Sequence, residues 1–271
     1  MKKKFIVSLV MGFMLINTSV GVKANEIGET NQNIYNSEKQ LDPEISKRID
    51  ERMEEYNNKY SKQLIDIEKV NLLLEDKESL TDFERKEAEV ELLKLEEAFK
   101  SEEVNTLDLG GGPPTGSNNI SFSNFSNGDI ILLHDGFCSY GFWRHAGVYD
   151  SATGDFISAT PASGMVRQSK TKMRGYDEAL GVCPENFRNG SVNAKNVAKS
   201  LLDKKVPYSI KNASKNNNNY MYCSLVAWRA WKSSQNLDLD FDGGPTVIPT
   251  DLSHEYNTSG TKIIRRFVWS D

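Results

Sequence analysis

Cys223 begins an apolar helical pattern, Cys-Ser-Leu-Val-Ala-Trp-Arg-Ala-Trp, directly after a loop that contains four Asn at residues 216–219. The first N–H groups of a helix have no partner within the helix and lie at the positive end of its dipole. They stabilise a thiolate, which raises its nucleophilicity near neutral pH. The backbone amides of Cys223 and Ser224 are also suited to hold an oxyanion. The competing interpretation is a buried structural cysteine.

His145 heads a strand pattern, His-Ala-Gly-Val-Tyr, in which Gly147 leaves room beside the imidazole. Alternation puts Ala146 and Val148 on one face of the strand and His145, Gly147 and Tyr149 on the other. A base held on a rigid strand opposite a thiol at a helix start can draw the proton from sulfur. We therefore expect His145 to serve the thiol, although a lone strand histidine is more commonly a packed or surface residue.

Four motifs follow one another along the chain: Gly-Asp-Ile-Ile at 128–131, Arg-His-Ala-Gly-Val-Tyr at 144–149, Tyr-Cys-Ser-Leu-Val at 222–226, and Pro-Thr-Asp-Leu at 249–252. This set resembles the permuted papain-like amidases of the YiiX and YaeF type, a branch of the NlpC peptidoglycan hydrolase superfamily. The order of histidine before cysteine marks the permutation. The resemblance covers roughly residues 121–267, and it implies an α+β domain with an antiparallel sheet and packed helices.

The same resemblance implies that Cys223 is the nucleophile and His145 the base. A third polar residue, His or Glu in this family, lies on the next strand about a dozen residues further on, where this sequence has Ser158. A serine hydroxyl accepts the imidazole N–H but cannot offset charge on an imidazolium, so we expect weaker orientation and slower turnover. Thr160 or a backbone carbonyl is the alternative third group.

Several other polar and aromatic residues are weighed beside this site. Cys138 lies in a loop and lacks a helix start, and a disulfide between Cys138 and Cys183 would leave Cys223 as the odd thiol. The cysteines are too few and too scattered for a paired zinc site, so we expect no metal and no cofactor. His134 ends a predicted strand and is a candidate for the substrate cleft. His254 is expected at the surface. Glu178 is a carboxylate distant in sequence from the motifs, and no role is assigned to it. Five further residues are candidates for lining a substrate groove, although aromatic side chains at such positions more commonly belong to the hydrophobic core. They are Trp143, Tyr149, Thr160, Tyr208 and Tyr222.

The amino-terminal region has the layout of an exported protein. Residues 1–24 join a basic start, a short apolar run and small residues, which predicts a signal peptide cleaved after Ala24 and a secreted, extracellular or wall-associated protein. No later stretch is apolar enough for a transmembrane helix. Residues 25–40 are expected to form a disordered leader, and residues 105–120 a linker of Gly, Pro, Ser and Asn.

Residues 41–104 predict an α-helical hairpin. Apolar residues at helical spacing indicate one long helix over 42–74, and a capping box of Thr81 and Glu84 opens a second helix that continues through Phe99. The preferred interpretation is a stalk with a solvated charged face. The alternatives are self or partner contact, or a regulatory segment that covers the cleft.

Residues 121–271 predict the α+β domain that carries the motifs. Alternating patterns indicate strands, and apolar residues at helical spacing indicate helices between them. The expected strands are 129–134, 145–149, 156–159 and 164–168, and the expected helices are 194–202 and 223–231.

Net charge and composition limit the classes of function that the chain can have. The chain has a net charge of −5, and residues 41–103 hold 20 acidic and 11 basic side chains. Nucleic acid is excluded as a partner because phosphate binding needs a clustered basic face. The leading hypothesis is a secreted cysteine hydrolase that cleaves an amide bond, for example in a peptidoglycan peptide, through an acyl-enzyme. The alternatives are a lipid acyltransferase or thioesterase of the same superfamily, and a catalytically weak or inactive envelope-binding module.

Overall fold

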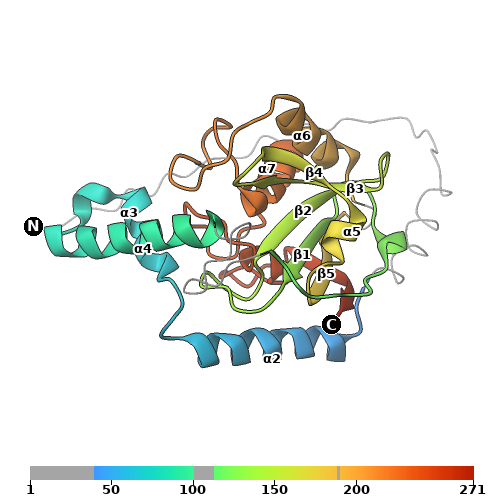
Figure 1. Cartoon of the computed structure of the whole chain (residues 1–271), viewed down its shortest axis with the longest axis horizontal. Coiled ribbons are helices and arrows are strands. Elements are labelled where there is room, and N and C mark those ends of the chain that lie inside the picture. The colour runs from blue at the N-terminus through green and yellow to red at the C-terminus, as the bar shows by residue number, and fades with distance from the viewer. Residues whose placement is uncertain (1–39, 101–112, 188–189) are drawn as a thin grey trace, which may run out of the picture.

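The computed structural model describes residues 40–100, 113–187 and 190–271. Their centre is a six-stranded antiparallel sheet in the order β4-β3-β2-β1-β5-β6, packed against helices, which confirms the predicted α+β class (Figure 1). The predicted signal peptide, residues 25–39 of the leader and residues 105–112 of the linker lie outside the described residues. The strands are β1 Ile130–His134, β2 His145–Asp150, β3 Asp155–Thr160, β4 Gly164–Gln168, β5 Glu178–Pro184 and β6 Ile264–Ser270.

The four predicted strands are confirmed, and β5 and β6 are additional. The sequence of β5, Glu-Ala-Leu-Gly-Val-Cys-Pro, is buried at every position, so it shows no polar alternation that would reveal a strand. It pairs with β1 on one side and β6 on the other. A bulge between Gly181 and Val182 shifts its register with β6.

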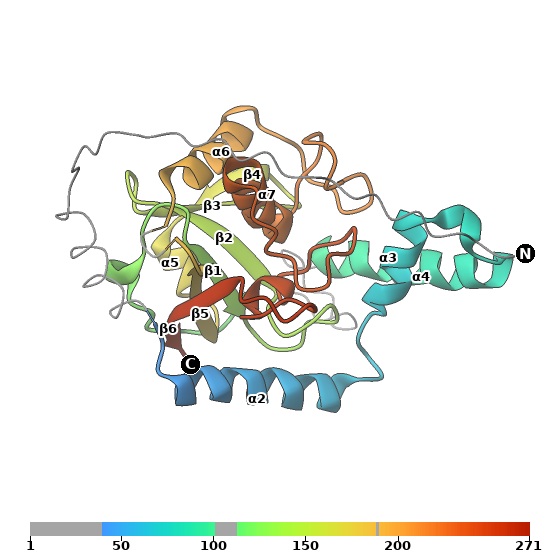
Figure 2. The same cartoon turned by 180° about the vertical axis from the view of Figure 1, so that it is seen from behind.

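Two different layers cover the two faces of the sheet. Helices α6 (Val192–Asp203) and α7 (Cys223–Gln235) pack on one face, and the short helix α5 (Lys170–Met173) lies on the other (Figures 1 and 2). Ala146 and Val148 of β2 belong to the buried cluster that contains α7. The alternate residue Tyr149 belongs to the cluster that contains Met173 of α5. The strand alternation predicted for β2 is therefore confirmed.

Helix α7 is buried along its first nine residues. It begins after the extended residue Tyr222 and ends before the cap residue Asn236, whose N–H donates to the Lys232 carbonyl and whose left-handed conformation turns the chain out of the helix. Trp231 is completely buried, and its indole N–H donates to the Gly128 carbonyl over 2.9 Å. This bond fixes the carboxyl-terminal half of α7 against the start of β1.

The amino-terminal region forms three helices, α2 (Pro43–Tyr60), α3 (Ile67–Glu75) and α4 (Asp82–Lys100). The predicted capping box is confirmed, because the Thr81 N–H donates to Glu84 Oε2 at 2.9 Å and the Glu84 N–H donates to Thr81 Oγ1 at 3.3 Å. Helices α3 and α4 pack together as a hairpin.

The prediction of one helix over 42–74 is wrong. The helix stops at Tyr60, and Asp66 caps a new helix by accepting the Lys69 N–H at 3.1 Å. Between the two helices the Ile65 N–H donates to the Ser139 carbonyl at 2.7 Å. A tertiary backbone bond thus replaces a helical one, which helical periodicity in the sequence cannot reveal.

Helix α2 and the end of α4 pack on the α+β domain, whereas the rest of the α3–α4 hairpin projects away from it (Figure 1). Ile49 and Met53 of α2 and Phe99 of α4 are buried in the same cluster as α7. The Phe99 ring stacks on Tyr140 with ring centroids 4.0 Å apart, and it meets Tyr222 at 5.7 Å. In the described ranges, no helix combines the length and the apolar character that crossing a membrane requires.

A buried guanidinium joins helix α2 to strand β6. Arg266 of β6 is 1% exposed, and it donates to the Ser253 carbonyl at 2.9 Å, to the Ser46 carbonyl at 2.9 Å and to Asp50 Oδ1 at 2.6 Å. A buried arginine is tolerated only when its donors are satisfied. Arg266 therefore ties α2 to the α+β domain.

Candidate functional site

The His145 imidazole is held by two strands next to its own. Its side chain is 1% exposed, and Nε2 lies 2.8 Å from Gln168 Oε1 of β4 and 3.4 Å from Ser158 Oγ of β3. An amide oxygen only accepts, so Nε2 carries the proton and donates it to Gln168. The Ser158 hydroxyl donates to the Ala146 carbonyl at 2.6 Å, so it is already engaged with the backbone.

Gln168 was missed in the sequence, where Ser158 and Thr160 were considered for the third position. The register places Gln168 opposite Phe156, on the face that also holds Ser158. Alternation along the predicted strand 164–168 provides this signal, because its last residue lies on that face. The amide is neutral, so it orients the imidazole without stabilising a positive charge on it.

The Cys223 thiol lies at the start of α7, as predicted. The residue is 1% exposed and belongs to the apolar cluster of the α7 face. The hydrogen bonds among the described residues include none to this thiol. Ser224 Oγ donates to the Val247 carbonyl at 2.7 Å, and the Val247 N–H donates to the Tyr222 hydroxyl at 3.0 Å, which fixes the helix start. Burial raises the pKa of Tyr222, so this hydroxyl stays protonated.

The structure does not bring Cys223 and His145 together. His145 pairs with Leu133, which belongs to the cluster on the α5 face, whereas Cys223 belongs to the cluster on the α7 face. A Cβ added at Gly147, on the same side of β2 as His145, would meet Phe156 and Ile131 of the α5 face. The sheet therefore separates imidazole from thiol, and the expected hydrogen bond between them is absent from the described geometry.

The predicted groove residues do not line a common groove. Trp143 and Tyr222 are buried in the cluster of the α7 face, and Tyr149 is buried in that of the α5 face. Thr160 is buried at the end of β3, where it pairs with Gly164. Tyr208 forms an isolated backbone bridge with Met221. Trp143, Tyr149 and Tyr222 are therefore residues of the hydrophobic core, which is the common role of aromatic side chains at such positions.

Cys138 and Cys183 are not joined by a disulfide. Cys138 belongs to the cluster on the α7 face and Cys183 to that on the α5 face, so the sheet lies between them. The Cys138 backbone is fixed instead by Tyr56, whose hydroxyl donates to the Cys138 carbonyl at 2.8 Å.

A polar cleft of about 680 Å³ opens between α2 and the adjoining ends of β1 and β5. Cations, carboxylates and aromatic rings line it together. His134 and Glu178, which the sequence left without a firm role, both lie in this cleft. Its lining residues are Arg52, Glu55, Tyr56, Lys59, Tyr60, Ser117, His134, Gly136, Phe137, Phe142, Asp177, Glu178 and Asp271.

Buried polar groups form the floor of this cleft. Glu178 is 4% exposed, and its carboxylate binds Arg52 and accepts the indole N–H of Trp269 at 3.4 Å. His134 Nδ1 donates to the Phe142 carbonyl at 2.6 Å, which leaves Nε2 as an acceptor when the ring is neutral. Burial lowers the pKa of His134 and so favours the neutral ring, although nearby carboxylates oppose the shift.

The prediction that His254 lies at the surface is only partly met. Its ring stacks on Phe241 with centroids 4.0 Å apart. Burial lowers its pKa, and the positive charge of Arg266 acts in the same direction.

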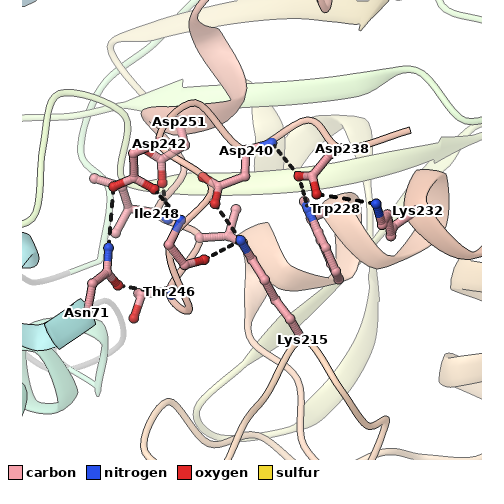
Figure 3. A network of polar contacts seen from close by, with 12 residues as sticks. Asn71, Lys215, Trp228, Lys232, Asp238, Asp240, Asp242, Thr246, Ile248 and Asp251 are labelled. Carbon is pink, nitrogen blue, oxygen red and sulfur yellow. Dashed lines mark hydrogen bonds and ion pairs between the residues drawn. The ribbon is translucent and has the colours of Figure 1, made fainter. Parts of the chain in front are cut away.

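A second polar cluster lies beside α7, in the segment 238–251 (Figure 3). Lys215 pairs with Asp240, and Asp251 Oδ2 accepts the Ile248 N–H at 2.7 Å. Burial raises the pKa of Asp240 to about 6, and burial likewise raises the pKa of Asp251, with the charges of Asp240 and Asp242 adding to the effect. Negative charge is therefore only partly compensated here.

Comparison with known proteins gives one distant likeness. No family model and no curated protein matches the sequence. The crystal structure of the metalloprotein YiiX from Escherichia coli O157:H7 matches with a TM-score of 0.33 and 13% sequence identity, over 54% of this chain and 89% of that chain. A TM-score of this size carries no argument about activity.

Proposed function

We propose that this chain is a secreted, envelope-associated binding module on a permuted papain-like scaffold, and that the cleft beside α2 takes its ligand. The observation that carries the proposal is the separation of Cys223 and His145 by the sheet, which leaves no assembled thiol–imidazole pair. The cleft instead offers about 680 Å³ lined by charged and aromatic groups, against about 420 and 460 Å³ in two other pockets of the described residues.

The ligand class follows from the lining of the cleft. Glu178 pairs with Arg52, and Asp271 pairs with Arg48 at 3.8 Å. Of the other charged lining residues, the carboxylates of Glu55 and Asp177 outweigh the ammonium of Lys59. The tilted rings of Tyr60 and Phe137, with centroids 4.8 Å apart, add an aromatic surface. Carboxylates beside aromatic rings attract an ammonium group on an apolar stem. We therefore propose an envelope peptide that carries a free amino group.

Binding to purified peptidoglycan and to a soluble wall peptide tests this proposal. Tyr60→Ala and Asp177→Asn should each weaken the affinity about tenfold, because each removes one contact to the ligand. Asp203→Asn is the matched control, since the exposed Asp203 of α6 pairs with Lys199, away from the cleft. Equal binding by all four proteins, or binding that acetylation of the peptide amine leaves unchanged, would contradict the cleft as the site.

The second candidate function is the cysteine hydrolase. It is favoured by a thiol at the start of α7 and by a histidine whose Nε2 is held by Gln168, the arrangement of an oriented base. Such a reaction would require the thiolate of Cys223 to attack an amide carbonyl and the imidazole to protonate the leaving amine before water releases the acyl group. It also requires a rearrangement that brings the two side chains to one face.

Turnover of wall peptides by the wild type and by Cys223→Ala separates the two candidates. The binding module predicts equal, background rates and equal affinity in both proteins. A rate that is lost in Cys223→Ala while affinity is retained would instead establish the hydrolase. Product analysis with an added amine or alcohol acceptor would then distinguish transfer of the acyl group from hydrolysis.

A further inference from the structure

The loop that follows α7 has the spacing of a calcium-binding loop. From residue 238 the chain reads Asp-Leu-Asp-Phe-Asp-Gly-Gly, which places carboxylates at the first, third and fifth positions and glycine at the sixth. In such loops the seventh residue contributes its carbonyl, and the sixth makes a sharp turn. Gly243 holds the sixth position with φ +76°, a conformation that glycine adopts without strain.

A positive charge already lies between two of the expected ligands. The Lys215 ammonium binds the carboxylate of Asp240, the third position (Figure 3). It also binds the carbonyl of Gly244, the seventh position. These two groups come from one loop, whereas Lys215 reaches in from the loop before α7. Lys215 therefore occupies the place where a calcium loop holds its ion.

One ligand oxygen at this point has no partner. Asp240 is 4% exposed, its Oδ2 binds Lys215, and its Oδ1 is buried without a hydrogen bond to any of the described residues. A buried carboxylate oxygen in that state is costly, because it has lost water and gained no donor. The oxygen is thus available to a cation that can bind both oxygens of the carboxylate.

Further acidic side chains lie next to Asp240. The carboxylate of Asp242 accepts the Gly244 N–H at 2.8 Å and the side-chain amide of Asn71 at 3.3 Å. Asp251 belongs to the same network and stands two residues after the twelfth position, which is proline here. The carboxylate of Asp238 accepts the indole N–H of Trp228 at 2.8 Å, which holds it apart from Lys215.

The cluster is reachable from solvent. A groove of about 460 Å³ runs over Gly243, Gly244 and Pro245, and Lys215 forms part of its wall beside Ser214. A hydrated ion can approach the Gly244 carbonyl along this groove, and the flexible lysine stem has room to turn outward into it.

We propose that the loop of residues 238–246 binds Ca²⁺, which replaces the Lys215 ammonium between Asp240 and the Gly244 carbonyl. As the described side chains stand, no three acidic, imidazole or thiol groups gather closely enough to hold a metal. Binding therefore draws Asp242 or Asp251 toward the ion while Lys215 leaves. Ca²⁺ suits this mixture of carboxylates, carbonyl and water better than Mg²⁺, which demands a rigid octahedron. Competition with the lysine makes the affinity weak, on the order of 10⁻⁴–10⁻³ M as in extracellular calcium modules.

Terbium luminescence excited through tryptophan tests the site in the full chain, because Trp228 directly contacts the loop. The wild type should show saturable luminescence that excess Ca²⁺ displaces, and millimolar Ca²⁺ should raise its Tm. Lys215→Met should bind about tenfold more tightly, since the competing ammonium is gone. Asp240→Asn should lose both signals, and Asp203→Asn should retain them.

Three results would overturn the proposal. Absence of luminescence and of a Tm shift in both the wild type and Lys215→Met would show that the loop holds no metal. Binding by Lys215→Met alone would show that the lysine fills the cation position permanently. Unchanged binding by Asp240→Asn, with folding verified by circular dichroism, would place the ion elsewhere.

Discussion

The two faces of the sheet differ in the environment that each gives to one residue of the predicted catalytic pair, Cys223 and His145. On the α7 face, Cys223 lies among apolar side chains without a polar partner in the described structure. On the α5 face, His145 is bound by Gln168 and Ser158. The difference teaches that motif order along a chain does not establish a site, because one step along a strand moves a side chain to the other face.

Truncation of one large side chain on each face should have the largest effect. Trp231→Ala on the α7 face and Phe156→Ala on the α5 face should each lower the free energy of unfolding by about 3–5 kcal/mol, because both residues are completely buried. Chemical denaturation followed by circular dichroism measures the loss. A large loss on one face only would show that the other face contributes little to stability.

Loss of the amide that holds His145 should have a smaller effect. Gln168→Leu should cost about 1–3 kcal/mol, because the buried Nε2–H loses its 2.8 Å acceptor and keeps the longer contact to Ser158. Gln168→Glu is the matched comparison, since it keeps an acceptor and raises the imidazole pKa, which NMR titration can follow. If Gln168→Leu is as stable as the wild type, the 2.8 Å contact does not hold the ring.

His134, the second histidine in the sheet, should make the stability of the protein depend on pH. It lies next to Leu133, the partner of His145, and so points to the opposite face of the sheet. Burial lowers its pKa below the ordinary 6.5, so the unfolded chain binds the proton more readily, and stability is lost as pH falls below about 6.5. Between pH 7.5 and 5, the wild type should therefore lose more stability than His134→Gln. Parallel pH profiles for the two proteins would contradict this assignment.

The smallest expected effect is on the reactivity of Cys223, and it tests most directly whether the sheet separates this thiol from His145. His145→Ala should change the rate of Cys223 alkylation by iodoacetamide less than about twofold, whereas a thiolate–imidazole pair predicts a loss of tenfold or more. Peptide mapping measures this rate, and Cys183 on the α5 face is the internal reference. A tenfold loss specific to Cys223 would show that the two groups meet in solution.

Much of the architecture was predictable. The α+β class, the first four strands, the start of α7 and the capping box of α4 all follow from local patterns that depend on neighbouring residues. Strand β5 was missed because it is buried on both faces, so its residues after Glu178 show no alternation of polar and apolar side chains. The break of the first helix at Tyr60 was missed because its cause, the bond from Ile65 to Ser139, joins distant segments.

The candidate sites were less predictable for the same reason. The alternation of β2 was read correctly, but the face that α7 would cover depends on how the helix packs on the sheet. The cleft draws Arg52 from α2 and Glu178 from β5, two residues 126 positions apart that no local motif connects. Gln168, in contrast, lies in a strand that was predicted, and the register of that strand with its neighbour places it on the face of Ser158.

Arg266 has a consequence for the order in which the chain folds. Its guanidinium binds the carbonyl of Ser46, a residue 220 positions earlier, so α2 cannot complete its docking until β6 is available. Contacts of such long sequence separation slow folding, because a large loop must close before they form. Helix α2, although synthesised early, is therefore among the last described elements to reach its place, and its apolar stripe stays exposed to other chains in the meantime.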